Sequence, residues 1–235
     1  MKAVILAAGI GKRLAPYTQE IPKCLLNVNG KEIIEFQLNA LKLHKISDIY
    51  VVTGHLSDKV EGSVGNRAKC IYNPFYQEGI LLSFKTAMEH LYSHEFIYIA
   101  GDVVFHPGVL GRIMETTGDV VLGVENKECD EEDSKALIKN NEIIKTGKRL
   151  ENPDADSHIS ELVHIIKFSG KGSRSFFDII EEILGKQDRN AYMMDALNRM
   201  REKGLKLIPA YVKNLPRTEI DFKNDLDEAN SRKWH

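Results

Sequence analysis

The sequence predicts an α/β fold built around a mainly parallel β-sheet, and three observations support this prediction. Short apolar runs alternate with amphipathic stretches through the first half of the chain, which is typical of strand–helix–strand units. A glycine-rich turn follows the first apolar run directly. The 235 residues, 43% of them hydrophobic, are enough for one large domain with a substantial core.

The elements of the first half follow from periodicity. Residues 3–8 and 48–53 are expected to be strands, and residues 32–44 between them a helix, because apolar side chains recur there at helical spacing. Together they form one right-handed βαβ unit. The same reasoning gives, in order, a strand at 68–72, a helix at 80–92, a strand at 96–100, a helix with Pro107 in its first turn, and a strand at 119–124.

The second half begins with a break in this regularity. Residues 128–133 are almost all acidic and are expected to be a solvated loop. Residues 136–139 and 142–145 read as a hairpin, because Asn140 and Asn141 tolerate the positive φ of a tight turn. The remaining predicted elements are a strand at 162–168, helices at 173–184 and 191–203, and strands at 205–212 and 218–222. With no repeat or linker in sight, we expect a single domain spanning residues 1–235.

Composition argues against several classes of protein. A formal net charge of −2 gives no positive field for a nucleic-acid backbone, so no nucleic-acid partner is expected. No apolar stretch approaches the roughly 20 residues of a membrane span. The cysteines number 3 and are widely separated, which predicts neither a disulfide framework nor a zinc site and favours a cytoplasmic location.

The turn after the first strand is suited to an anion. Gly9 and Gly11 expose backbone N–H groups there, and Lys12, Arg13 and Lys23 add positive charge in the same connection. These features predict a phosphate-binding loop.

Two familiar phosphate-binding motifs do not fit this loop. A dinucleotide-binding fingerprint requires glycine or alanine where this chain has Leu14. A P-loop requires Ser or Thr after the lysine, where this chain has Arg13. An oxidoreductase of the dinucleotide-binding type therefore remains only a weak alternative.

The segment reads LAAGIGKRL from Leu6 to Leu14 and is followed by Pro22-Lys23, and this pattern resembles the signature of the nucleotidyltransferase superfamily. The likeness is closest to the cytidylyltransferases of the phosphocholine and phosphonate type. The resemblance implies a Rossmann-like three-layer α/β/α sandwich with a mainly parallel mixed sheet. It also implies a small β-rich lid inserted at about residues 127–170, on the substrate side.

The resemblance further implies a magnesium-dependent reaction. Asp102, just past the strand at 96–100, and Asp221 would hold one Mg²⁺ together, and their hard carboxylate oxygens suit that ion. Arg13 would hold the β- and γ-phosphates, and Lys23 would neutralise charge at the α-phosphoryl group. No Ser-His-Asp or Cys-His arrangement is evident, and a phosphate nucleophile, already ionised near neutral pH, requires none.

The nucleotide would lie against the first strand and the start of a later helix. The nucleotide-binding residues expected from the resemblance are Leu6, Ala7, Ala8, Gly9, Gly11, Lys12, Leu82 and Ser83. CTP is expected from the cytidylyltransferase branch, while UTP and dTTP stay open.

The second substrate is expected to be a small phosphorylated alcohol or phosphonate. The resemblance points to Lys148 for its phosphate, with Lys145 as an alternative, and to Glu161, Tyr192, Asp195 and Glu219 around the rest of it. Acids beside an aromatic ring suit a cationic head group. The sole tryptophan, Trp234, lies at the C-terminal end, which argues against a tryptophan-walled choline cage.

Two further functions compete with this one. A sugar-1-phosphate nucleotidyltransferase shares the loop, the lysine and the paired aspartates. A non-catalytic nucleotide-binding regulator would usually lack one of the charged residues that this chain keeps. The sequence does not give the oligomeric state, although exposed edges of the C-terminal part could support a homodimer.

Overall fold

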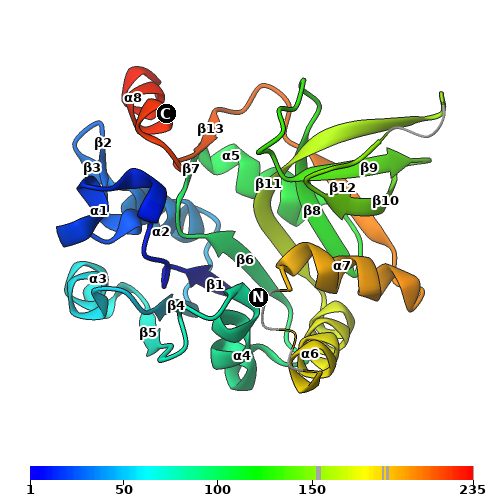
Figure 1. Ribbon diagram of the computed structural model, residues 1–235, viewed down its shortest axis with the longest axis horizontal. Coiled ribbons are helices and arrows are strands. Elements are labelled where there is room, and N and C mark those ends of the chain that lie inside the picture. The colour runs from blue at the N-terminus through cyan, green and yellow to red at the C-terminus, as the bar shows by residue number, and fades with distance from the viewer. Residues whose placement is uncertain (152–154, 187, 189–190, 235) are drawn as a thin grey trace.

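A nine-stranded mixed sheet runs through the molecule (Figure 1). The computed structural model describes residues 1–151, 155–186, 188 and 191–234. In spatial order the strands are β5 (Lys69–Tyr72), β4 (Ile49–Thr53), β1 (Lys2–Leu6), β6 (Phe96–Ala100), β11 (Ser157–Phe168), β8 (Val120–Glu125), β12 (Leu207–Tyr211), β10 (Glu142–Gly147) and β9 (Lys135–Lys139).

The two halves of the sheet differ in strand direction. β5, β4, β1 and β6 pair in parallel throughout, as the alternating sequence pattern predicts. β11 then runs antiparallel to both β6 and β8, while β12 is parallel to β8 and β10 is antiparallel to β12. The sheet is therefore mixed, with its parallel part in the N-terminal half.

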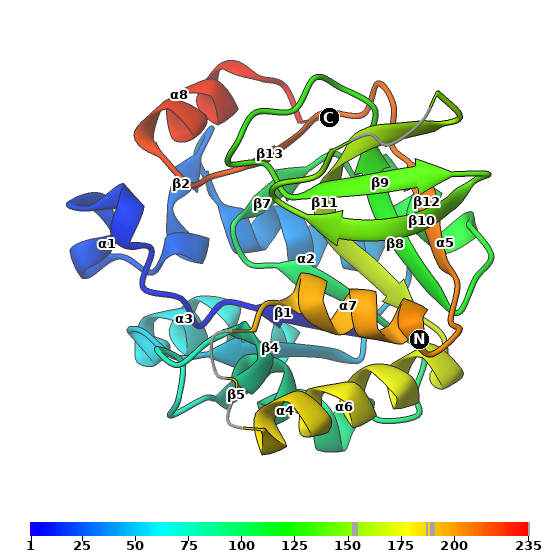
Figure 2. The ribbon, with the colours of Figure 1, turned by 45° about the vertical axis from the view of Figure 1, so that its right-hand side comes forward.

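Helices cover both faces of this sheet, which confirms the three-layer arrangement. α4 (Ile80–Leu91), α6 (Gly170–Gly185) and α7 (Met193–Glu202) lie on one face, and α2 (Ile33–Leu43) and α5 (Pro107–Glu115) on the other (Figure 2). α6 begins earlier than the apolar pattern indicates, because Ser169 caps it by accepting a hydrogen bond from the Gly172 N–H at 3.1 Å.

The predicted hairpin is present and belongs to the main sheet. Asn140 and Asn141 adopt φ values of 51° and 57°, as the turn requires. β9 pairs with β10 on one side and with residues 157–161 of β11 on the other. The segment expected at about 127–170 is thus β-rich and continuous with the central sheet through β11. Its residues 152–154 lie outside the described part of the chain.

One predicted strand is wrong in its extent. The strand expected at 218–222 is β13 (Arg217–Glu219), which pairs antiparallel with β7 (Val103–Phe105), so Asp221 lies beyond it. The chain leaves the strand because the Asp225 carboxylate accepts the N–H groups of Asp221 and Phe222 and starts α8 (Lys223–Ser231).

The sequence patterns also missed α3 (Ser57–Val64) and α8. Each buries too little apolar surface to give a clear periodicity: α8 buries only Ala229, and α3 only Val60 and Val64.

A small second hydrophobic core joins the segment that follows β1 to β7 and to the C-terminal segment. Its buried members are Leu14, Leu26, Val28, Ile33, Val104, Ile220, Ala229 and Trp234. They come from the glycine-loop connection, the short β2 (Asn27–Val28), α2, β7 and the C-terminal segment. Trp234 is 4% exposed and donates its indole N–H to the Ala229 carbonyl, so its role is structural.

None of the helices in the described part of the chain has the length and apolar character needed to span a bilayer.

Candidate active site

The glycine loop leaves β1 at the carboxyl end of the parallel strands. Gly11 has φ +69°, and a Cβ there would lie 3.0 Å from Thr18 Cγ2, so both conformation and space require glycine. The Thr18 hydroxyl fixes the turn by donating to the Gly11 carbonyl at 2.8 Å. Nothing lies within 4 Å of the position that a Cβ on Gly9 would take, which leaves its backbone open to a ligand.

Lys23 lies between two carboxylates. Its Nζ is 2.6 Å from Asp102 Oδ2 and 2.6 Å from Asp221 Oδ1. A cavity of about 260 Å³ opens here, and its lining residues are Gly9, Gly11, Lys12, Arg13, Lys23, Asp102, Glu219 and Asp221. The structure therefore brings the predicted catalytic cations, the predicted metal ligands and part of the predicted nucleotide loop to one place.

Sheet topology explains how residues so distant in sequence meet. Asp102 occupies the turn between β6 and β7, and the register of β7 with β13 sets Val103 opposite Glu219. The Ile220 N–H donates to the Asp102 carbonyl at 3.0 Å. Gly101 is required in this turn, because a Cβ would lie 2.6 Å from the Leu6 carbonyl oxygen.

Arg13 is the second cation at this cluster. Its guanidinium lies 2.7 Å from Asp221 Oδ2 and 5.1 Å from the centre of the Phe222 ring. A weaker contact of 3.9 Å joins it to Glu132 on the acidic loop. Its side chain is 49% exposed, so it is accessible to an incoming phosphate.

The buried charges determine each other's protonation. Burial alone would lower the pKa of Lys23, but Asp102 and Asp221 outweigh it and raise that pKa well above its usual value. Burial would raise the pKa of Asp102, and Lys23 outweighs it and lowers that pKa. Burial, with some help from the two aspartates, raises the pKa of Glu219. At neutral pH the lysine is charged and Asp102 is ionised.

Three carboxylates converge in a set that fits a divalent cation. Asp102, Glu219 and Asp221 each offer one oxygen, and these oxygens lie within 4.8 Å of one another. Asp102 Oδ1 is buried and has no hydrogen-bond partner among the described residues. A donor set of carboxylate oxygens suits Mg²⁺. Glu219, expected to line the acceptor pocket, thus lies with the two aspartates that were predicted to hold the metal.

The family of the chain follows from a comparison of its sequence with family models. The model of the MobA-like NTP transferase domain matches residues 3–200. The chain belongs to this family. The nucleotidyltransferase resemblance of the glycine loop is thereby confirmed, and the protein is a nucleotidyltransferase.

Individual members of the family give finer comparisons. A protein named CTP:phosphoglutamine cytidylyltransferase from Campylobacter jejuni is 26% identical over 97% of this chain and 98% of its own length. A choline-phosphate cytidylyltransferase from Streptococcus pneumoniae is 48% identical over 61 residues, or 26% of this chain and 27% of that one. The solved inositol-1-phosphate CTP transferase from T. maritima has a TM-score of 0.78 at 23% identity, covering 98% and 94% of the two chains, and so shares the fold.

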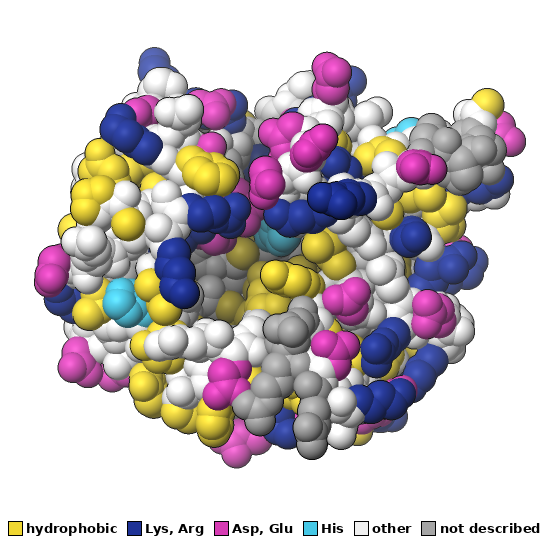
Figure 3. Space-filling view, viewed as in Figure 1, with side chains coloured by type: hydrophobic (Ala, Val, Ile, Leu, Met, Phe, Trp, Pro, Cys, Tyr) yellow, Lys and Arg dark blue, Asp and Glu magenta, His cyan; other side chains and the backbone are white. Residues whose placement is uncertain are grey.

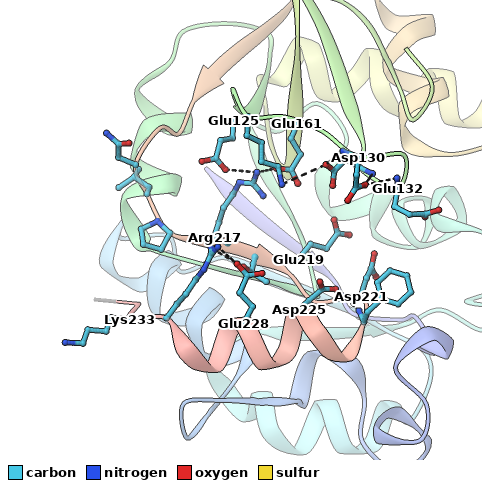
Figure 4. Close-up of a pocket in the computed structure, with 18 residues that line it drawn as sticks. Glu125, Asp130, Glu132, Glu161, Arg217, Glu219, Asp221, Asp225, Glu228 and Lys233 are labelled. Atoms are coloured by element: carbon cyan, nitrogen blue, oxygen red, sulfur yellow. Dashed lines mark hydrogen bonds and ion pairs between the residues drawn. The ribbon is translucent and has the colours of Figure 1, made fainter. Parts of the chain in front are cut away.

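A larger cavity of about 690 Å³ adjoins the carboxylate cluster and shares Glu219 and Asp221 with it (Figure 4). Figure 3 shows a hollow in this face of the transferase, with Lys and Arg side chains gathered beside it and Asp and Glu side chains above it. Among the residues lining the larger cavity, acids outnumber bases by nine to four. The cavity is therefore suited to a ligand that carries positive charge.

A buried ion network forms one wall of this larger cavity. Arg217 is 7% exposed and pairs with Glu161 and, at 2.8 Å, with Glu125. Lys127 lies 3.0 Å from Glu161. Glu161, predicted to contact the acceptor, lines the cavity and is held by these two cations.

Other predicted site residues lie elsewhere. Ser83 is buried and accepts a hydrogen bond from Asn73 at 3.0 Å, while Leu82 lines a separate cavity of about 460 Å³ beside α4. Lys148 is 3.1 Å from Glu132, a residue that lines the larger cavity.

The two predicted residues at the start of α7 also lie outside the cluster. Tyr192 is 67% exposed, and Asp195 accepts its backbone N–H at 2.7 Å, which caps the helix. Neither is among the described residues that line the two site cavities. Their contact with substrate remains a prediction.

Sequence reasoning missed Glu125, Lys127, Arg217 and His164. His164 lies at a bulge of β11 with φ 55°, its Nε2 3.5 Å from Glu219 Oε2. Of the four, only His164 falls within a predicted strand, at 162–168, while Glu125, Lys127 and Arg217 lie just outside the predicted strands and the acidic loop. The spacing of Arg217, Glu219 and Asp221 at every second position is the one sequence pattern that could have pointed to Arg217.

Proposed function

We propose that the protein transfers CMP from CTP to a small phosphorylated alcohol or phosphonate bearing a positive charge, and releases pyrophosphate. One observation carries the proposal: Lys23, Arg13, Asp102 and Asp221 converge beside an open glycine loop. The choice of CTP is supported by the full-length relative named as a cytidylyltransferase.

The glycine loop and Arg13 are proposed to hold the β- and γ-phosphates. The backbone near Gly9 is open, and the half-exposed guanidinium of Arg13 has a geometry that matches phosphate oxygens. Lys12 lines the same cavity and adds a third donor. The triphosphate would then lie over the carboxyl end of β1, with its α-phosphorus toward Lys23.

Lys23 is proposed to stabilise the charge that develops at the α-phosphoryl group. Two aspartates raise the pKa of Lys23 and keep it protonated, so it can act without a proton transfer. Asp102 and Asp221, with Glu219 beside them, would hold a divalent cation, which would supply positive charge against the repulsion between the nucleotide and the incoming phosphate. The acceptor oxygen attacks the α-phosphorus in line as pyrophosphate leaves.

The acceptor is proposed to occupy the larger cavity. Its phosphate or phosphonate would face the carboxylate cluster, and its charged end would reach the acidic wall near Glu161 and Asp133. The excess of acids there favours an amine-bearing acceptor over a neutral polyol. Trp234 is buried in the second core, which speaks against a tryptophan cage for choline.

The test is pyrophosphate release with Mg²⁺. CTP, UTP, dTTP, GTP and ATP are each combined with phosphocholine, phosphoethanolamine, aminoethylphosphonate, an amino-acid phosphate, inositol phosphate and several sugar 1-phosphates. We expect turnover with CTP and an amine-bearing acceptor. Turnover with UTP or dTTP and a sugar 1-phosphate would overturn the proposal in favour of a sugar nucleotidyltransferase. Nucleotide binding without turnover would favour a regulator.

A further inference from the structure

Gln37 breaks the apolar pattern of α2. The buried residues of this helix are Ile33, Ile34, Gln37, Leu38, Ala40 and Leu41. Gln37 is 0% exposed, at a position where helical spacing calls for an apolar side chain. Its Oε1 is buried and has no partner among the described residues, which makes the residue costly to the fold.

The other end of the same carboxamide explains why glutamine is kept there. Its Nε2 donates to the Ala100 carbonyl at 2.8 Å and to the Val103 carbonyl at 2.9 Å. These two carbonyls bracket the two-residue turn Gly101–Asp102 between β6 and β7. Both hydrogens of one amide group therefore fasten the ends of the turn that carries Asp102.

Two backbone hydrogen bonds hold the middle of the same turn. The Gly101 N–H donates to Leu6 at 3.0 Å, which ties the turn to β1, and the Ile220 N–H donates to the Asp102 carbonyl at 3.0 Å, which ties it to the C-terminal segment. α2 runs alongside β7 behind this turn (Figure 2). The two hydrogen bonds of Gln37 connect that helix to the turn.

We infer that Gln37 is a positioning residue that orients the Asp102 carboxylate for metal binding. It touches neither substrate nor metal and acts through the backbone on both sides of Asp102. Partners of this kind, one step removed from the metal ligands, usually change metal affinity about 10- to 100-fold when removed. The inference rests on the nucleotidyltransferase activity of the site and not on the choice of CTP or acceptor.

The first test removes both hydrogen bonds and keeps the volume, with Gln37→Met. We expect the Mg²⁺ concentration for half-maximal activity to rise about tenfold, with the KM for nucleotide at saturating Mg²⁺ little changed. In the metal-free protein, amide exchange at Gly101 and Ile220 should accelerate about tenfold. Ala40→Gly is the matched control, because it weakens the same buried helix without removing either bond.

A Gln37→Met variant that keeps the parent's Mg²⁺ dependence and amide exchange would overturn the inference. An Ala40→Gly variant that changes the Mg²⁺ dependence and the amide exchange as much as Gln37→Met does would also overturn it, because general loosening of α2 would then account for the effect. The unaltered protein gives a test that needs no variant and no substrate: the Gly101 and Ile220 amides should exchange as slowly as those of β1. Rapid exchange there would mean that the turn is not held.

Discussion

The two cavities of the site balance charge in opposite ways. We call the smaller cavity, beside the glycine loop, the phosphate side, and the larger cavity, proposed to bind the acceptor, the acceptor side. On the phosphate side, Arg13 and Lys23 approach Asp102 and Asp221 while remaining next to an open glycine loop. On the acceptor side, acidic side chains outnumber basic ones, and Arg217 is buried against Glu125 and Glu161. The phosphate side is therefore suited to bind a polyanion, and the acceptor side is suited to bind a cation.

Under the proposed function, the phosphate side would determine the reaction and the acceptor side would determine which acceptor is used. The phosphate side lies at the end of the parallel strands, where the topology itself creates a ligand crevice. The acceptor side lies where β8, β11 and β13 meet the acidic loop, and most of the residues that line it are charged. Under the proposed function, a change of acceptor would therefore require changes only on the acceptor side.

The largest effect is expected from breaking the buried network on the acceptor side. Arg217→Met leaves Glu125 and Glu161 with less compensation in a buried setting, and should lower the free energy of unfolding by about 3–5 kcal/mol. Denaturant titration of the variant and the parent protein measures this difference in the free energy of unfolding.

Two further variants serve as tests of this prediction. Arg217→Met combined with Glu161→Gln should lose less than the sum of the two single changes, because the second removes a stranded charge. Arg112→Met, at an exposed arginine of α5, should change the free energy of unfolding by less than about 0.5 kcal/mol. Additive losses in the double variant would mean that the network is not coupled.

On the phosphate side, Lys23→Ala should have the largest effect on rate. Losing the cation between Asp102 and Asp221 should lower kcat about 10²–10³-fold, on the order of 3–4 kcal/mol of transition-state stabilisation. Steady-state pyrophosphate release measures it, with Lys42→Ala, an exposed lysine on α2, as the control. A loss confined to KM would instead assign Lys23 to ground-state binding.

Arg13→Ala should act mainly on nucleotide binding. The side chain is half exposed and faces the glycine loop, so we expect the KM for the nucleotide to rise about tenfold, or about 1.4 kcal/mol. The KM for the acceptor should change much less. An equal rise in both constants would show that Arg13 serves the two sides alike and would weaken the contrast between them.

The smallest effects concern cysteine reactivity, which reports on how far the cysteine of each side is exposed to solvent. Cys24 lies beneath the phosphate side, and burial raises its pKa to about 12, so roughly 10⁻⁴ of it is thiolate at pH 8. Cys129 lies in the acidic loop of the acceptor side and is partly exposed. Iodoacetamide at pH 8 should modify Cys129 first and Cys24 last, as mass spectrometry of the digested protein would show.

The same thiol predicts a pH dependence of stability. The pKa of Cys24 is raised in the folded state from 9.0 to about 12, so the unfolded chain loses its proton first. Cys24 therefore makes the fold less stable as pH rises from about 9 toward 12, and Cys24→Ala should flatten that slope in alkaline thermal melts. An unchanged slope would mean that other groups dominate it.

Much of the phosphate side could be predicted from sequence because its residues follow a buried strand within a short connection. Gly11, Arg13 and Lys23 are near one another in the chain, and Asp102 directly follows a strand. Asp221 was placed through a resemblance, and its local structure was misjudged. A polar cap, and not a pairing partner, decides where β13 ends.

The acceptor side could not be predicted in the same way. Glu125 and Lys127, at the end of β8, meet Arg217 of β13 beside Glu161 of β11, and nothing in their local sequence indicates this convergence. Gln37 was also unpredictable in its role, since a single glutamine within a helical pattern is commonplace until its two carbonyl partners are known. The fold class and the helices with a clear apolar face depend on local periodicity and are predicted from sequence, whereas α3 and α8 bury too little apolar surface to be predicted.

The distance along the chain between the parts of the site also constrains biosynthesis. Lys23 and Asp221 are 198 residues apart in sequence, yet their side chains are in contact. A nascent chain on the ribosome has its phosphate-binding loop long before it has Glu219 and Asp221. The carboxylate cluster is therefore completed only when the last part of this sequence has emerged, and a chain interrupted before β13 lacks both Glu219 and Asp221.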